Sequence, residues 1–365
     1  MNIGIITFHR AENFGAVLQA YALQTYLSSL GHEVKIIDYR CTAIEQSYDI
    51  VNPRILGSRK NVLLSTRLYF GRFINLKKRI LKKARFKCFR KKYLYLTEAV
   101  TEVCEDMGFD AYITGSDQVW NLHLTHGLDK VYFLSFPMKD KAKKVAYAAS
   151  SEDDPKGLLW KNKKVISNLL NDFDSVSVRE EFLKKDIARY VDKPVHVCVD
   201  PTLLLEREAY SQVLNVPEVT EKYVLIYHMT PTREGVSLAN RIAQTYGYRV
   251  IEIFGGYTKL RDNSRYKCDL GPSEILGYIS RAEVVITTSF HGLALSLIFN
   301  KAFWIMDHSG NYRQRNLLSL LGLENRLVYN PAECDIDAKI DYTEVNTQLS
   351  IAVEESKQFL NNSLS

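Results

Sequence analysis

His291 lies where an apolar segment passes into a predicted helix, a position suited to anion or acid–base chemistry. The run Val284–Thr288 predicts a buried strand, and His291–Phe299 predicts the helix that follows it. Ligands collect at the carboxyl ends of strands in open α/β sheets, and a helix N-terminus favours an anion. His291 could therefore bind phosphate or act as a general acid, with Ser289 and Gly292 as binding residues beside it. The alternative is a helix-capping or core histidine.

Arg179 follows another predicted strand, Ser175–Val178, and a short helix comes after it. The planar guanidinium offers two parallel donors that match a carboxylate or a phosphate. We therefore expect Arg179 to hold an anionic substrate group in a catalytic role. The alternative is an ion pair with Glu180, Glu181 or Asp186.

Two further strand-to-loop junctions carry candidate binding residues. Asn13 and Gly15 lie in the first loop, where glycine allows close backbone approach and asparagine can bind sugar hydroxyls. Ser116 and Asp117 follow the strand Asp110–Thr114, and Asp117 could accept a proton from an attacking hydroxyl. The alternatives are a simple cap and turn at Asn13, and an aspartate that holds its own loop. The first loop lacks G-x-G-x-x-G, so a dinucleotide is not indicated.

Histidine and cysteine spacing gives little support for a metal. His228, at the end of the predicted strand Tyr223–His228, is a further binding candidate. His123 and His126 are three residues apart, but no third ligand stands out. The six cysteines contain no C-x-x-C pair and are expected to be reduced thiols. We predict no metal site.

The elements that position these residues alternate between strands and helices. A chain of 365 residues exceeds what one hydrophobic core usually serves, so two domains are expected. In the first half, five predicted strands and a long helix from Gly15 precede the strand His196–Val199. In the second, Glu234–Tyr246 and a helix capped by Ser273 connect further strands. This pattern predicts two doubly wound, Rossmann-like α/β domains.

We expect an N-terminal domain over 1–210, a C-terminal domain over 211–343, and a final helix and tail over 344–365. No signal peptide or transmembrane segment is predicted, which favours the cytoplasm. The oligomeric state is not predicted.

A basic segment over 50–97 interrupts the first domain. It has no acidic residue and carries 15 basic ones between Arg54 and Lys92, leaving 33 basic residues against 42 acidic ones elsewhere. Leucine, isoleucine and phenylalanine alternate with these charges, a pattern typical of helices at anionic membrane surfaces. The alternative is a solvated helical insertion. No recognition motif accompanies the charge, so nucleic-acid binding is not expected.

Six short segments, taken together and in order, resemble the polysaccharide pyruvyltransferase family. They span about residues 3 to 326, nearly the whole chain. The segments are Asn13-Phe14-Gly15 with Leu18-Gln19, Gly115-Ser116-Asp117-Gln118-Val119-Trp120-Asn121, Tyr147-Ala148-Ala149-Ser150, Ser177-Val178-Arg179-Glu180, Asp200-Pro201-Thr202 and Ser289-Phe290-His291-Gly292.

The resemblance implies a fold like that of the two-domain glycosyltransferases of the GT-B type, with the acceptor in the first domain and the donor in the second. It implies transfer of a pyruvyl group from phosphoenolpyruvate, a co-substrate, to two hydroxyls of a capsular or exopolysaccharide sugar, giving a ketal. No metal or other cofactor is implied. A polyprenyl-diphosphate-linked acceptor would explain a basic surface over 54–92 and peripheral attachment to the inner face of the membrane.

One position departs from the family pattern. Many members have an arginine two residues before the motif histidine, where this chain has Ser289. Arg313 or Arg315 could supply the missing guanidinium. Two alternatives therefore stay open: a nucleotide-sugar-dependent glycosyltransferase of the same fold, and a non-catalytic sugar-binding member. The presence of both His291 and Arg179 argues against the second.

Overall fold

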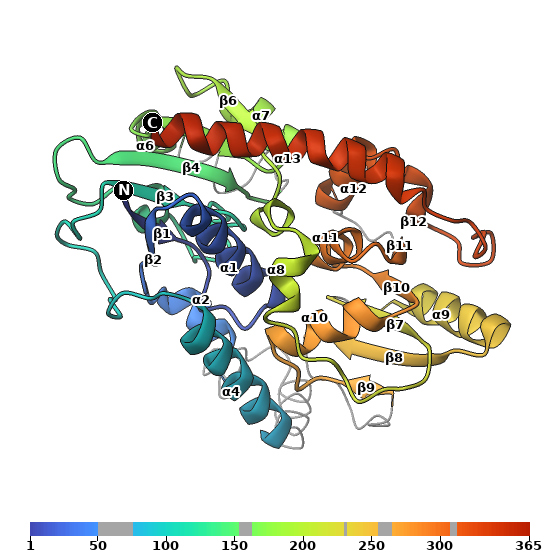
Figure 1. Cartoon of the computed structure of the whole chain (residues 1–365). Coiled ribbons are helices and arrows are strands. Elements are labelled where there is room, and N and C mark those ends of the chain that lie inside the picture. The colour runs from blue at the N-terminus through green and yellow to red at the C-terminus, as the bar shows by residue number, and fades with distance from the viewer. Residues whose placement is uncertain (50–75, 153–162, 230–231, 255–264, 307–311) are drawn as a thin grey trace, which may run out of the picture. The chain divides into compact units, whose positions relative to one another are not determined.

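The computed structural model of this chain describes residues 1–49, 76–152, 163–229, 232–254, 265–306 and 312–365. Residue contacts divide the chain into two compact units (Figure 1). Unit 1 comprises Met1–Ser47, Arg90–Leu205 and Thr347–Ser365, and unit 2 comprises Tyr48–Phe89 and Glu206–Asn346. Each unit is built on its own six-stranded sheet, which confirms the two Rossmann-like α/β units predicted from the sequence.

Unit 1 contains a parallel sheet whose central strands are fully buried. Burial on both faces requires continuous apolar runs, which is why Ile3–Ile6 is recognisable in the sequence. In spatial order the strands are β2 (Glu33–Ile36), β1 (Asn2–Ile6), β3 (Ala111–Thr114), β4 (Lys143–Ala149), β5 (Ser175–Val178) and β6 (Val195–Val197). The strand order reverses between β1 and β3, and ligands bind at such a switch point in doubly wound folds.

The longest helix that lies wholly in unit 1 is α1 (Phe14–Ser29), which connects β1 to β2. Almost all of its residues are buried, including Gln19 and Gln24, as expected of a helix that lies inside a core. Gly31, with φ of +86°, directly follows the helix end, where a left-handed residue is favoured. The other helices of this unit are α2 (Thr42–Ser47), α6 (Lys163–Asn171), α7 (Glu181–Ile187) and the 3₁₀ turns η2 (Lys130–Phe133) and η3 (Pro201–Leu204).

Unit 2 also contains a parallel sheet. In spatial order its strands are β12 (Leu327–Val328), β11 (Ala302–Met306), β10 (Val284–Thr287), β7 (Tyr223–His228), β8 (Arg249–Phe254) and β9 (Tyr266–Lys267). In chain order this arrangement is 6-5-4-1-2-3, the Rossmann order, and it reverses between β7 and β10. His228 and Ser289 lie at the carboxyl ends of these two strands.

Helix α9 of unit 2 begins and ends at residues with clear capping roles. Thr232 accepts a hydrogen bond from Gly235 N at the start of α9, and Gly247 ends that helix with φ of +69°. The prediction that Ser273 caps the next helix is wrong. Pro272 occupies its first position, and the Glu274 carboxylate accepts from Gly271 N at 3.0 Å. The helices are α8 (Arg207–Ser211), α9 (Arg233–Tyr246), α10 (Pro272–Arg281), α11 (Phe290–Ile298), α12 (Tyr312–Leu320) and the 3₁₀ turn η4 (Glu324–Arg326).

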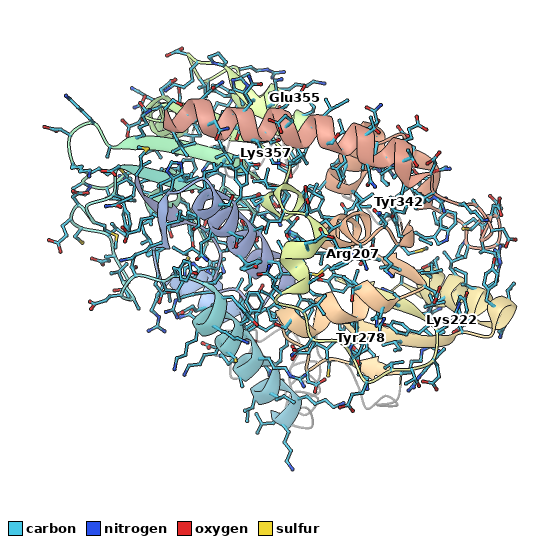
Figure 2. The ribbon with its side chains drawn as sticks, viewed as in Figure 1. Arg207, Lys222, Tyr278, Tyr342, Glu355 and Lys357 are labelled. Atoms are coloured by element: carbon cyan, nitrogen blue, oxygen red, sulfur yellow. The ribbon has the colours of Figure 1, made fainter. Side chains whose placement is uncertain are left out.

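Two helices contribute residues to both units. These are α4 (Leu76–Tyr93) and α13 (Tyr342–Leu364). In α13, the Tyr342 hydroxyl donates to the Lys301 carbonyl of unit 2 at 2.5 Å, while Ser356 accepts from Val199 N of unit 1 at 2.9 Å (Figure 2 labels Tyr342). The final helix, expected over 344–365, begins at Tyr342, and its residues from Thr347 onwards belong to unit 1.

The basic segment was expected to be an insertion in the first domain, but most of its described part belongs to unit 2. Residues 76–89 belong to unit 2, because Arg85 donates to the Asp269 carbonyl at 2.8 Å and lies 3.7 Å from the Glu274 carboxylate. Within the described ranges, no helix is both long enough and apolar enough to cross a membrane.

Candidate functional site

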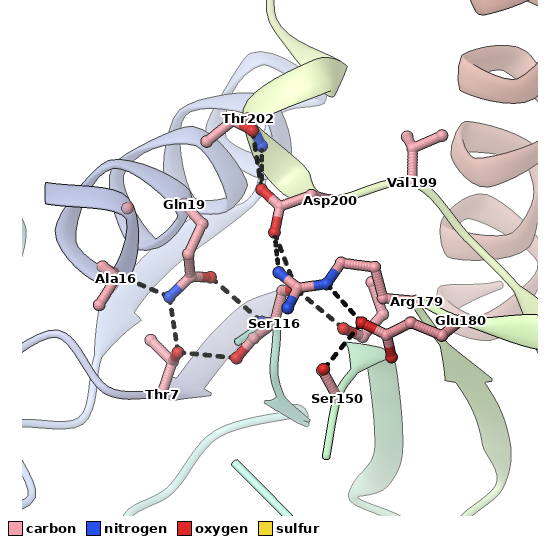
Figure 3. Close-up of polar contacts among 12 residues, drawn as sticks. Thr7, Ala16, Gln19, Ser116, Ser150, Arg179, Glu180, Val199, Asp200 and Thr202 are labelled. Atoms are coloured by element: carbon pink, nitrogen blue, oxygen red, sulfur yellow. Dashed lines mark hydrogen bonds and ion pairs between the residues drawn. The ribbon is translucent and has the colours of Figure 1, made fainter. Parts of the chain in front are cut away.

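In unit 1, the loops after β1 and β3 are joined by hydrogen bonds around Gln19 (Figure 3). The Gln19 amide donates to Thr7 Oγ1 at 2.7 Å and accepts from Ser116 N at 3.1 Å. Thr7 Oγ1 in turn donates to the Ser116 carbonyl at 3.1 Å. Gln19 thus fixes the two loops that flank the switch point of this sheet.

The Asn13 side chain caps α1. Its Oδ1 accepts hydrogen bonds from Gly15 N at 2.9 Å and Ala16 N at 3.4 Å. This is the capping geometry weighed as the alternative to ligand binding. Asn13 and Gly15 lie at the start of the first helix, beside the switch point, and their part in substrate binding stays a prediction.

Ser116 and Asp117 differ in accessibility although they are adjacent. The Ser116 hydroxyl is fully buried and donates to the Ala148 carbonyl at 2.8 Å, which indicates a structural role. Asp117 is half-buried and has φ of +68°. No described residue donates a hydrogen bond to its carboxylate, and its charge contributes to the field at Arg179. Asp117 is therefore the better candidate for accepting a proton from a substrate.

Arg179 forms a buried ion-pair triad with two carboxylates (Figure 3). Its Nε donates to Glu180 Oε1 at 3.0 Å and its Nη1 donates to Asp200 Oδ2 at 2.5 Å. The side chains of all three residues are at most 3% exposed. Ser150 donates to Glu180 at 2.8 Å, and Thr202 donates to Asp200 through its amide and its hydroxyl.

The electrostatics of this triad favour the charged arginine. Burial opposes the charge, but Glu180 and Asp200 outweigh it and raise the pKa of Arg179 above its ordinary value. Because two of its nitrogens already bind protein carboxylates, the guanidinium anchors Asp200 and, through it, Ser116 at 3.3 Å. Its direct contact with an anionic substrate stays a prediction.

In unit 2, the turn between β10 and α11 is fixed by short-range hydrogen bonds. Thr287 Oγ1 donates to the Tyr227 carbonyl at 2.7 Å and accepts from Ser289 N at 2.9 Å. Ser289 caps α11 by accepting from Gly292 N at 3.3 Å. The residue at the place of the family arginine therefore starts the helix, and its hydroxyl belongs to the cap.

His291 is the second residue of α11 and is 8% exposed. Its ring meets that of Phe290 edge to face, with centroids 5.3 Å apart. At this position it lies among the first amides of the helix, where the dipole favours an anion. His228, at the end of β7, is buried, and its Cε1 would lie 3.3 Å from a Cβ added to Gly235 of α9. The two histidines thus flank the β7–β10 switch point.

Gly292 allows α11 to approach β10 closely. A Cβ at this position would lie 2.3 Å from Thr287 Oγ1 and 2.9 Å from the Tyr227 ring. No side chain fits there without displacement, so the glycine is explained by packing. Its role as a ligand-binding residue stays a prediction.

Helix α12 reaches the same turn through Gln314. The buried Gln314 amide donates to the Thr288 carbonyl at 3.1 Å. Arg313, half-buried, precedes Gln314, whereas the exposed Arg315 lies over the Tyr329 ring at 5.6 Å. Of the two candidate substitutes for the missing guanidinium, Arg315 is thus engaged with an aromatic ring.

A charged cluster at the ends of β1 and β2 was not among the residues predicted from the sequence. His9 is 1% exposed, and its ring nitrogens lie 3.1 Å from the Thr7 carbonyl and 2.8 Å from Asp38 Oδ1. Arg10 binds both Asp38 oxygens at 2.6 Å and Glu45 at 2.9 Å. His9 and Asp38 lie just after β1 and β2, so the rule that ligands collect at the carboxyl ends of strands could have marked each as a candidate. Their pairing depends on the adjacency of the two strands.

Burial opposes ionisation of the Asp38 carboxyl. The hydrogen bonds from His9 and Arg10 outweigh that effect, so the pKa of Asp38 lies well below its usual range. Asp38 is therefore an anion that orders the first loop.

The described ranges contain no group of three or more side chains that could hold a metal ion. Of His123 and His126, the two histidines considered as metal ligands from their spacing, His123 lies 3.1 Å from the Glu152 carboxylate. All six cysteines are free thiols, and four of them are buried.

Helix α4 presents only some of its basic residues to solvent. Arg79 and Lys82 are 4% and 3% exposed and share the buried face with Phe86 and Phe89. Both residues belong to the basic surface expected over 54–92, and their burial means that they do not contribute to such a surface. Arg54 to Arg72 lie outside the described residues. The exposed face of α4 contains Lys77, Ile80, Leu81, Lys87 and Lys91.

Comparison with known proteins gives a family match over most of the chain. A family model described as polysaccharide pyruvyl transferase matches residues 13–310. This range contains every candidate residue above except those of the first loop before Asn13, Arg313 and Arg315. A search of curated proteins found no match.

Several solved structures are similar to this chain at low identity. The glycosyltransferase SnogD from Streptomyces nogalater is 13% identical with a TM-score of 0.42, covering 100% of this chain and 99% of its own. The UDP-GlcNAc 2-epimerase from Neisseria meningitidis is 9% identical with a TM-score of 0.45, covering 100% and 94%. The E. coli heptosyltransferase WaaC is 12% identical with a TM-score of 0.40, covering 100% of both chains.

Proposed function

This chain belongs to the polysaccharide pyruvyl transferase family, and we propose that it transfers a pyruvyl group from phosphoenolpyruvate to two sugar hydroxyls. The product is a cyclic ketal on a capsular or exopolysaccharide precursor. The observation that carries the proposal is the placement of the motif histidine, His291, in the first turn of α11 at the switch point of unit 2.

The proposed reaction requires an acid and a base. A proton adds to the methylene carbon of phosphoenolpyruvate, and positive charge develops at the neighbouring carbon. One acceptor hydroxyl bonds to that carbon and loses its proton. The second hydroxyl then displaces phosphate from the same carbon, and its proton leaves with the released phosphate. No other cofactor is needed for this balance.

The residues of the two switch points support these roles. His291 supplies the proton, and the first amides of α11 receive the donor's anionic groups. Asp117 accepts the hydroxyl proton, because its carboxylate is accessible and carries no hydrogen bond from a described residue. Arg179 acts by holding Asp200 and Ser116 in place.

The experiment that tests this function measures product mass and phosphate together. Purified protein is incubated with phosphoenolpyruvate and a panel of oligosaccharide acceptors. We expect one acceptor to gain the mass of a single pyruvyl ketal, with one inorganic phosphate released per ketal. Phosphate release that is independent of any acceptor, with no mass gain across the panel, would count against the proposal.

A nucleotide-sugar-dependent glycosyltransferase is the second candidate, favoured by the capping serine, Ser289, where a guanidinium was expected. Thermal shifts separate the two. A ligand that binds the folded state at a hundred times its Kd stabilises it by about 2.7 kcal/mol. Stabilisation by phosphoenolpyruvate but not by UDP- or GDP-sugars supports pyruvyl transfer, and the reverse supports glycosyl transfer. A response to sugar alone indicates a non-catalytic binding protein.

We also propose that the acceptor is lipid-linked and that the protein works in the cytoplasm, peripherally at the inner face of the membrane. The exposed face of α4 supports this, because Ile80 and Leu81 are 52% and 42% exposed between lysines. Each basic residue close to an anionic surface contributes about 1 kcal/mol of attraction.

Changing Lys77, Lys87 and Lys91 to Gln should weaken binding to anionic vesicles. The control changes three exposed lysines elsewhere, Lys164, Lys185 and Lys339. Equal vesicle binding by the two triple variants would remove this role from α4.

A further inference from the structure

Arg90 is a cation held in a fixed place in unit 1. It lies in the last turn of α4, and the residues after it are anchored to α1. The Gln24 side chain donates to the Tyr93 carbonyl at 3.0 Å and accepts from Tyr95 N at 2.7 Å. Beyond them, Tyr95 O accepts from Ile36 N of β2 at 2.7 Å. The backbone of Arg90 is thus tied to two core elements of unit 1.

The Arg90 guanidinium makes no hydrogen bond and no ion pair with any residue that the structure describes. Its Nη1 is buried, whereas the side chain as a whole is only half-buried. Burial lowers the pKa of Arg90, and the neighbouring charge of Arg10 lowers it further. A partly buried charge without partners is costly in a folded protein.

The nearby carboxylates are bound by other cations. Asp38 is bound by His9 and by both arms of Arg10, and Glu45 is bound by Arg10 and Arg40 at 2.9 Å each. Glu12, Asp38 and Glu45 attract Arg90 through space, but none of them pairs with it. Of these two neighbouring arginines, Arg10 thus binds two carboxylates, whereas Arg90 binds none among the described residues.

We propose that Arg90 binds an anionic group of the acceptor, a phosphate or diphosphate ester, at the edge of unit 1 where β1 and β2 end. The Nε and Nη2 atoms offer the two-pronged geometry that phosphate esters accept. An incoming anion would supply the partner that the described residues do not provide.

The assignment to the acceptor rests on the proposed function. In that proposal the donor anions are bound at α11 in unit 2, while Asp117 of unit 1 receives the proton of the acceptor hydroxyl. An anion site in unit 1 then belongs to the acceptor. A sugar 1-phosphate and a polyprenyl-diphosphate-linked sugar share this chemistry.

The test measures binding of inorganic pyrophosphate to the full-length protein by calorimetry. Arg90→Gln should weaken binding about ten- to a hundredfold, the loss expected for a charge-assisted pair of hydrogen bonds. Lys185→Gln removes one positive charge from an exposed position elsewhere in unit 1 and should change binding less than about twofold, as expected for a screened surface charge. Equal effects of the two substitutions would overturn the proposal.

A second readout separates binding from folding. Removal of a partly buried, unpaired charge should leave the melting temperature of the ligand-free protein unchanged or raise it. A clear drop in Arg90→Gln would assign Arg90 to structure and overturn the proposal.

Kinetics then identify the ligand. Arg90→Gln should raise KM for a phosphorylated acceptor, soluble or lipid-linked, and leave KM for phosphoenolpyruvate unchanged; a rise for phosphoenolpyruvate alone would refute the acceptor assignment. If wild type transfers no pyruvyl group, the proposed function fails, while the pyrophosphate titration still decides whether Arg90 binds anions.

Discussion

At the residue scale, the buried triad makes Arg179 a stability determinant as well as a candidate catalytic residue. Arg179→Ala would leave Glu180 and Asp200 buried without their cation, and breaking a buried pair in this way costs about 3 to 5 kcal/mol. We expect urea unfolding to show a loss of this size together with lost activity. Arg179→Lys keeps the charge but not both donors, so it should recover part of the stability. A fully stable, inactive Arg179→Ala would instead favour direct contact with substrate.

His291 should behave differently, because its proposed role is to deliver a proton in the reaction and not to hold the loops of unit 1 together. His291→Gln should lower kcat by about a hundredfold, the usual loss for one general acid, with little change in melting temperature. The control is His32→Gln, which changes a histidine at the amino end of β2 in unit 1 and should leave kcat unchanged. Turnover near the wild-type value in His291→Gln would reject the acid role.

Asp38 predicts a particular pH dependence of stability. Its depressed pKa means that the folded state favours the carboxylate more than the unfolded chain does. Its contribution is therefore present above the unfolded pKa of about 3.9 and is lost as the pH falls towards the folded value. Asp38→Asn should cost about 2 kcal/mol at neutral pH. In urea unfolding, the gap between wild type and variant should narrow below about pH 4; a constant gap would show that the charge of Asp38 is not what stabilises the loop.

At the element scale, the close approach of α11 to β10 depends on a single glycine. Gly292→Ala would place a Cβ 2.3 Å from Thr287 Oγ1, against a residue whose hydroxyl is fixed by two hydrogen bonds. Overpacking of this kind costs about 1 to 3 kcal/mol. Ser289→Ala, which removes only the cap, should cost about 1 kcal/mol. Comparing the two by urea unfolding tests whether packing or capping dominates this turn; a smaller loss in Gly292→Ala would show that the helix shifts without cost.

Elements with strong local signals were predictable, and those that depend on tertiary packing were not. Buried strands such as β3 and β10 are continuous apolar runs, and their carboxyl ends contain Ser116, Asp117 and His291 as expected. The two-residue strands β9 and β12 are too short to give a periodic pattern. The cap of α10 was misplaced by two residues because Pro272 and Glu274 were overlooked as start signals.

The contacts within the candidate sites were likewise not predictable from the sequence, because they depend on tertiary packing. A candidate arginine can be identified from its position after a strand, but its partners come from other strands. Asp200, which binds Arg179, follows β6, and the burial of Lys82 depends on the packing of α4. Family motifs located the two switch points, while the His9–Asp38 pair needed the adjacency of β1 and β2.

At the scale of the whole molecule, the chain passes into unit 2 twice, over Tyr48–Phe89 and Glu206–Asn346, and returns to unit 1 in the last helix. The C-terminal half of α13 is therefore a core element of unit 1, although it is farthest from β1 in sequence. Phe359 lies against Tyr147 and His196, with ring centroids 6.4 and 5.2 Å apart, and Leu360 is fully buried.

This return predicts that a substitution near the C-terminus weakens the unit that begins at the N-terminus. Leu360→Ala should cost about 2 to 5 kcal/mol, the range for a leucine removed from a packed core. Ile351→Ala, on the same helix but 53% exposed, should change stability by less than about 0.5 kcal/mol. Hydrogen exchange of both variants should show faster exchange in β4 to β6 for Leu360→Ala only. Unchanged protection of those strands would mean that α13 rests on unit 1 without stabilising it.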